Sequence, residues 1–150
     1  MKLNRFLIKK NYIAIKLKYT KTNHYQIKAK INGKKGVFIL DTGASNTCIG
    51  SEFVDKFKLI TSQTELKAIG AGSTDITTEI SDNNIIKMGK WKKRNNSLVI
   101  IDVSHINAAL VSHNSKPIDG IIGADILKKG KAIVAYSSNL LYLKKEYFEY

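Results

Sequence analysis

The sequence predicts a single all-β domain that contains one or two short helices. Apolar residues and lysines alternate along several segments, turn-forming residues separate those segments, and helical periodicity is confined to two short stretches. With 150 residues, of which 43% are hydrophobic, the chain can bury one sizeable core and is too apolar to be disordered. We therefore expect a basic N-terminal segment at residues 1–11 and one domain at residues 12–150.

The first half of the domain begins with alternating strands. Apolar side chains occupy every second position of residues 12–19 and again of residues 25–31, and lysines stand between them. Asn32-Gly33 is typical of a two-residue hairpin turn, so the chain should return as a strand through residues 37–40. That strand is apolar on both faces, which predicts a central place in the sheet.

The rest of the chain adds further strands and the two helices. Residues 51–57 predict a short helix with Ser51 as its N-cap. Residues 66–80 predict a hairpin whose tip is glycine-rich. The remaining expected elements are strands at 85–91 and 97–103 around a polar turn at 92–96, a strand followed by a short helix at 120–130, and a hairpin at 132–144.

The charge of the chain invites a nucleic-acid interpretation. Lysine and arginine total 25 against 12 acidic residues, a net charge of +13. Only Arg5 and Arg94 are arginines, whereas the reading of base edges depends on the arginine fork. The best nucleic-acid patch is the cationic run 87–94 around Trp91, and a solvated turn is the more ordinary reading of it. A non-catalytic basic β-domain that binds nucleic acid or peptides is the alternative function.

Several other site classes are not supported by the sequence. One cysteine, Cys48, excludes an internal disulfide, and Ser45 does not lie in the Gly-x-Ser-x-Gly pattern of a hydrolase nucleophile. We expect no metal and no cofactor, because the histidines lack carboxylates or thiols at ligand spacing. No stretch approaches the roughly 20 apolar residues of a membrane helix. We expect a cytoplasmic protein that does not bind membranes.

One candidate for chemistry is Asp41-Thr42-Gly43, which directly follows the apolar strand at residues 37–40. An acid at the end of such a strand is unusual, because a buried carboxylate is costly unless it is stabilised. Gly43 permits close approach of backbone, and the Thr42 hydroxyl can bind neighbouring main chain. These residues could hold a carboxyl group rigidly at the floor of a cleft, although the tripeptide alone is also compatible with a simple turn.

A second segment, Gly120-Ile121-Ile122-Gly123, predicts a tight apolar strand that can pass beneath the loop of Asp41. Taken alone it is an ordinary core strand that ends in a turn. The order of apolar strand, Asp-Thr-Gly, glycine-tipped hairpin and apolar-apolar-Gly is rare by chance. The combination is therefore the informative signal.

These segments, FILDTGASNTCI and DGIIGADIL, resemble the retropepsin-like aspartic proteases, specifically the small bacterial single-domain relatives of retroviral protease. The resemblance implies a closed β-barrel, a homodimer, and an aspartic endopeptidase acting on extended peptides. By match to the motif, Asp41 is the catalytic acid, Thr42 interlocks across the dimer, and Gly43 lines the cleft. Ala44 and Gly123 belong to the active-site loop and its support. The implied substrate-binding flap comprises Ile69, Gly70, Ala71, Gly72 and Ser73.

A single Asp-Thr-Gly per chain fits this chemistry. Aspartic proteolysis needs two carboxyl groups that share one proton, so the second must come from a two-fold partner. One carboxylate accepts a proton from the attacking water while the other donates to the scissile carbonyl oxygen. Asp102, Asp119 and Asp125 are poor replacements, because they stand in strand-end, turn-like and helix-start contexts.

The chain departs from the retroviral pattern at Ser45 and Ala124, where retroviral enzymes usually have an Asp and an Arg that pair with each other. Both partners are absent together, so no orphan charge remains, but substrate preference does not transfer. Ala44 stands where many aspartic proteases have a Ser or Thr that can bind the catalytic carboxylate. Because Ala44 has no donor, we expect a mildly acidic to near-neutral pH optimum.

Overall fold

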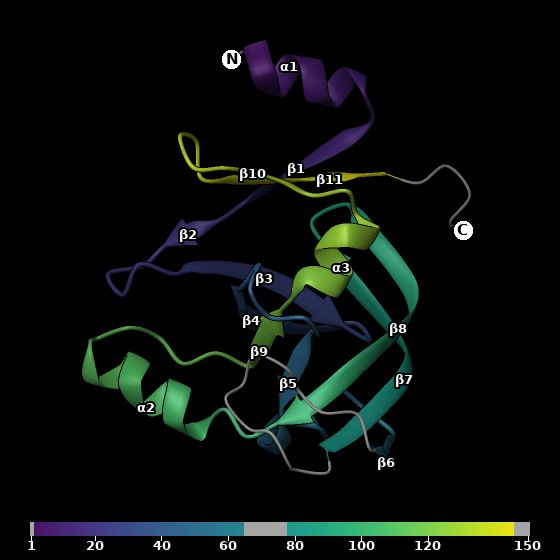
Figure 1. The fold of residues 1–150 in the computed structure, drawn as a ribbon, viewed down its shortest axis with the longest axis vertical. Helices are drawn as coiled ribbons and strands as arrows, with labels where there is room; N and C mark the ends of the chain where they lie inside the picture. The colour runs from purple at the N-terminus through teal and green to yellow at the C-terminus, as the bar shows by residue number, and fades with distance from the viewer. Residues whose placement is uncertain (1, 65–77, 146–150) are drawn as a thin grey trace.

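The computed structural model describes residues 2–64 and 78–145 of the chain (Figure 1). Its larger sheet has the strand order β2-β3-β4-β9-β5-β8-β7-β6. These strands are β2 (Lys18–Tyr19), β3 (Tyr25–Ile31), β4 (Lys34–Leu40), β5 (Cys48–Gly50), β6 (Thr61–Thr64), β7 (Thr78–Met88), β8 (Trp91–Ile101) and β9 (Gly120–Ile122). Strand β7 also pairs with β3, so six strands close into a barrel.

A smaller antiparallel sheet crosses one end of the barrel (Figure 1). Its strands, in the order β1-β11-β10, are β1 (Tyr12–Lys16), β11 (Leu140–Lys144) and β10 (Ile133–Ala135). Helix α1 (Lys2–Lys9) lies on its outer side, where Leu7 is buried with Tyr142 and the Tyr142 hydroxyl donates to Asn4 Oδ1 at 3.0 Å.

The main core fills the barrel and continues beneath the smaller sheet. Phe38, Phe57 and Ile49 are fully buried in the barrel, and Leu141 and Leu143 extend the same cluster from the smaller sheet. Helix α3 (Ala124–Lys129) inserts Ile126 and Leu127 into this cluster. The short helix η1 (Ser51–Phe53) and helix α2 (Ser104–Ser112) complete the elements.

The structure confirms the all-β barrel and most of the expected strands. Asn32 and Gly33 have the positive φ angles of +50° and +82° that a tight hairpin needs, and β4 lies between β3 and β9 as a central strand. The strand and helix expected at 120–130 are β9 and α3, and the last hairpin is β10–β11.

Three expectations about the elements are wrong, and two helices were not foreseen. The segment at 12–19 divides into β1 and β2, which belong to different sheets. The stretch at 92–96 is strand rather than turn, because the chain reverses earlier, at Gly89, whose φ is +56°. The N-cap of η1 is Gly50, not Ser51. Helices α1 and α2 were not expected at all. The hairpin at 66–80 falls mostly outside the described residues.

Candidate active site

The loop that carries Asp41 leads from β4 to β5, and β9 lies between these two strands in the sheet. Strands β4 and β9 run parallel, with Leu40 opposite Ile122, and the Asp41 amide continues the ladder by donating to the Ile122 carbonyl at 2.9 Å. The chain then turns tightly, because Gly43 N donates to Asp41 Oδ1 at 2.8 Å and Ala44 N donates to the Asp41 carbonyl at 3.2 Å. The amide, the carbonyl and the side-chain carboxylate of Asp41 are therefore each hydrogen-bonded to backbone groups.

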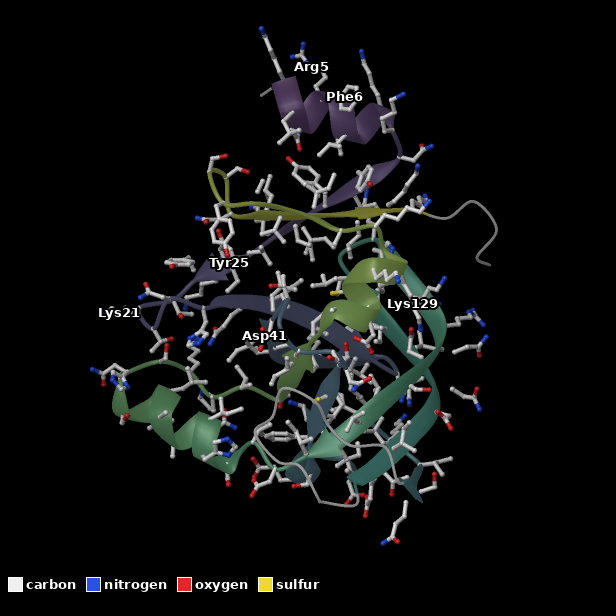
Figure 2. The ribbon with its side chains drawn as sticks, in the orientation of Figure 1. Arg5, Phe6, Lys21, Tyr25, Asp41 and Lys129 are labelled. Carbon is white, nitrogen blue, oxygen red and sulfur yellow. The ribbon has the colours of Figure 1, made fainter. Side chains whose placement is uncertain are left out.

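Asp41 is exposed in the single chain, as are Thr42 and Gly43. Figure 2 shows Asp41 on the body of the molecule, well separated from Arg5 and Phe6 on α1. The expectation that the carboxylate lies at the floor of a cleft concerns two chains together and stays a prediction. The Thr42 hydroxyl makes no hydrogen bond to any part of the chain that the structure describes. The loop thus presents a fixed carboxylate and an unused hydroxyl outward.

Gly123 supports this loop from below. The Ala124 amide donates to the Ala44 carbonyl at 2.7 Å, which brings the start of α3 directly against the loop. A Cβ atom at position 123 would stand 2.8 Å from the Ala44 carbonyl oxygen and from the Asn46 carbonyl group. Only a glycine fits this close approach, so the two sequence segments are brought together as their pattern predicted.

Thr47 is the structural link that sequence reasoning missed. Its side chain is fully buried, and its hydroxyl accepts from Gly123 N at 3.0 Å and donates to Asp125 Oδ1 at 2.8 Å. The same carboxylate oxygen accepts from Ile126 N at 2.8 Å, in the first turn of α3. A buried polar side chain needs a hydrogen-bond partner. A threonine directly before an apolar strand therefore indicated that its hydroxyl would bind a group nearby, and this was the signal available in the sequence.

Cys48 lies beside this network and is a packing residue, as expected. It is buried in β5, and its Sγ donates to the Asn46 carbonyl at 3.2 Å. Burial raises the pKa of the Cys48 thiol to about 12, and the negative charges of Asp125 and Asp41 add to the effect. The thiol therefore stays protonated and is not a nucleophile.

The other acids singled out by sequence have structural roles. Asp102 accepts from Ser104 N at 2.9 Å ahead of α2, and this backbone hydrogen bond is the main cause of its lowered pKa. Asp119 is not part of a solvated turn. It is buried, it accepts from Val37 N at 2.8 Å, and it forms an ion pair with Lys56 at 2.9 Å.

The remaining candidates contribute less. The flap residues 69–73 lie outside the described residues. Trp91 is only 3% exposed and its indole donates to the Lys144 carbonyl at 3.2 Å, so it cannot stack on a base. No cluster of three or more metal-ligating side chains occurs in residues 2–64 and 78–145. Within the same residues, no helix is long and apolar enough to span a membrane.

Comparison with known proteins gives a consistent result. A family model described as aspartyl protease matches residues 27–126. A retropepsin-like aspartic protease from Rickettsia conorii superposes with a TM-score of 0.60 at 20% identity, covering 88% of this chain and 89% of that one. EIAV protease, in complex with the inhibitor HBY-793, has a TM-score of 0.56 at 19% identity over 79% of this chain and 98% of that one.

The retroviral protease-like domain of Ddi1 from Leishmania major superposes with a TM-score of 0.54 at 14% identity, covering 79% of this chain and 86% of that one. These three likenesses show the retropepsin-like fold. No curated protein sequence matches the chain. The matched region 27–126 contains both the loop of Asp41 and the strand that ends at Gly123.

Proposed function

Because the chain belongs to the aspartyl protease family, a family of peptide hydrolases, we propose that it cleaves extended peptides at a site shared by two copies of the chain. Each copy contributes Asp41, and the two carboxyl groups share one proton. The observation that carries this proposal is the exposed Asp41 carboxylate on a loop tied to β9 and α3, together with a single Asp-Thr-Gly in the chain.

The proposed mechanism needs both copies of Asp41. One carboxylate accepts a proton from the attacking water, and the other carboxyl group donates its proton to the scissile carbonyl oxygen. The backbone bond from Gly43 N to Asp41 Oδ1 holds the carboxylate in one orientation, so little reorganisation is needed during the reaction. The outward hydroxyl of Thr42 is available to bind the partner loop across the two-fold axis.

The segment at 69–73 is proposed as a flap that covers the bound peptide. Backbone hydrogen bonds to an extended peptide would let the site accept varied side chains. Gly70 and Gly72 flank the proposed tip, so Gly70→Val and Gly72→Val should slow turnover without changing the melting temperature. Unchanged turnover in both variants would place the flap elsewhere.

The decisive variant is Asp41→Asn. The amide keeps an oxygen that can accept from Gly43 N, so the loop should stay folded while cleavage of an unfolded protein substrate falls at least about 100-fold. Asp55→Asn is the matched control, because Asp55 is also an exposed aspartate and lies outside the loop. Retained activity in Asp41→Asn, or equal losses in both variants, would refute the assignment.

Mixing experiments test whether the site is shared. When equal amounts of wild-type and Asp41→Asn chains exchange freely, about a quarter of the dimers carry two Asp41 side chains. The activity should then fall to about half of that shown by the same amount of wild-type chain alone. A site complete within one chain would lose nothing on mixing. Sedimentation analysis should give a dimer whose dissociation parallels loss of activity.

A further inference from the structure

A second concave site lies on the barrel away from Asp41. It is a pocket of about 530 Å³ between the outer faces of β3 and β4, the end of β7, and the segment after η1. This volume lies within the range of small-molecule sites. The charged side chains that line it are Lys28, Lys30, Lys35, Lys56, Lys87 and Asp119.

Three of these lysines form a row across three neighbouring strands. Lys30 on β3 stands directly opposite Lys35 on β4 and directly opposite Lys87 on β7. The next pair in the register, Ile31 and Ile86, is fully buried, so the three lysines share the outer face of the barrel. Like charges directly opposite each other in a sheet are destabilising. The sheet thus holds three cations in an unfavourable arrangement.

The row has no counter-charge of its own. Across residues 2–64 and 78–145 the only ion pair joins Lys56 to Asp119, and Asp119 is also bound by Val37 N. Lys28, Lys30, Lys35 and Lys87 have no acidic partner in that part of the chain. Among the described residues that line the pocket, the one carboxylate, Asp119, is thus already engaged, and four lysines have no acidic partner there.

The geometry points to an oligophosphate as the ligand of this pocket, and we propose that it binds a chain of two or three phosphates, free or carried by a nucleotide. Neighbouring strands lie about 4.8 Å apart, so the row is about 10 Å long, a length that three linked phosphates can follow. Lysine ammonium groups are compact charges with three donors each and suit phosphate oxygens. A single-stranded nucleic acid fits less well, because the described residues that line the pocket include no aromatic side chain on which a base could stack, and Trp91 is buried.

The test uses inorganic tripolyphosphate as the probe in titration calorimetry at moderate ionic strength. The pocket variant Lys30→Gln/Lys35→Gln/Lys87→Gln should bind at least about tenfold more weakly than wild type. The control variant Lys16→Gln/Lys18→Gln/Lys21→Gln removes the same charge from exposed positions outside the pocket, and its affinity should change less than about threefold. If the triple pocket variant does not fold, Lys30→Gln alone removes the centre of the row.

Two further measurements sharpen the result. Tripolyphosphate should raise the melting temperature of wild type and of the control variant, and not that of the pocket variant. Metal-free ATP tests the source of the phosphates: equal affinity identifies the phosphate chain as the recognised group, and tighter binding of ATP identifies a nucleotide.

Three outcomes would overturn the proposal. One is the absence of saturable tripolyphosphate binding to wild type. Another is an equal loss of affinity in the pocket and control variants, which would mean that only the net charge of the protein matters. The third is an oligothymidylate that binds tightly and that tripolyphosphate cannot displace, which would mark the face as a nucleic-acid site.

Discussion

Strand β4 has a charged site at each end, and the two sites differ in how their charges are compensated. At its end, Asp41 is held by backbone amides and by a loop that rests on Gly123. At its start, Lys35 is held only by sheet register, beside Lys30 and in the same row as Lys87. The Asp41 carboxylate has a backbone donor, whereas Lys30, Lys35 and Lys87 have no acidic partner within the described residues.

This difference separates two ways of preparing a surface for a ligand. In the proposed function the Asp41 carboxylate has to be oriented before the substrate arrives, and the hydrogen bond from Gly43 N orients it. Cations that only bind an anion need proximity, and their mutual repulsion in the free protein adds to the gain when an anion neutralises them. Substitutions that change the Asp41 loop and leave the lysine row intact, or the reverse, test whether the two sites behave differently.

The largest effect is expected at the support of the Asp41 loop. Gly123→Ala places a methyl group 2.8 Å from the Ala44 and Asn46 carbonyl groups, and should lower the free energy of unfolding by about 3 kcal/mol. Gly123 has a φ of −104°, which any residue adopts, so the cost is steric. Chemical denaturation measures the loss of unfolding free energy, and a peptide-cleavage assay measures the accompanying loss of activity. Gly33→Ala, with no atom within 4 Å but a φ of +82°, should cost about 1 kcal/mol and leave cleavage intact.

Thr47→Val should rank next. It removes the hydroxyl that joins Gly123 N to Asp125, and leaves a buried amide and a carboxylate each short of a partner. We expect a loss of about 2 kcal/mol in unfolding free energy and a larger proportional loss of cleavage, because the loop of Asp41 rests on this link. Thr47→Ser keeps the hydroxyl and should restore cleavage. Equal activities of the valine and serine variants would contradict the link.

Asp119→Asn changes the lysine pocket, which lies toward the start of β4. The amide oxygen can still accept from Val37 N, and only the ion pair with Lys56, which is 43% exposed, is lost. Unfolding free energy should fall by about 1 kcal/mol or less, since such a pair is partly screened by solvent. Release of Lys56 should strengthen tripolyphosphate binding severalfold in calorimetry while peptide cleavage is unchanged. Weaker tripolyphosphate binding would count against the pocket as proposed.

The smallest expected change is a shift in pH dependence. In Ala44→Ser, the serine hydroxyl can donate a hydrogen bond to the Asp41 carboxylate. This bond favours the state in which both Asp41 carboxyl groups of the proposed dimer are ionised, and that state is inactive. The shared-proton state then disappears at a lower pH, so the basic limb of the pH–rate profile should move toward acid by roughly half a unit to one unit. A profile shifted toward base, or a wild-type optimum below about pH 3.5, would contradict this account.

The sequence determined the parts of this protein that depend on neighbouring residues. Asn32-Gly33 accepts the positive φ angles of its hairpin, the alternation of residues 25–31 requires one buried face, and Gly123 ends a strand where backbone approaches closely. The Asp-Thr-Gly and its apolar-apolar-Gly partner were recognisable for the same reason, because each is a local backbone requirement. Local chemistry therefore predicted the all-β class and the residues of the candidate loop, and the closed barrel was implied by the family resemblance.

Only the tertiary structure decided which distant residues meet. The pairing of β3 with β7 closes the barrel and aligns Lys30 with Lys87, although nothing in either segment indicates the other. Thr47 became part of the loop support only when β9 and α3 were placed beneath it. Strand register, barrel closure and buried polar contacts are non-local properties, so the sequence around a residue does not show which distant partner it will meet.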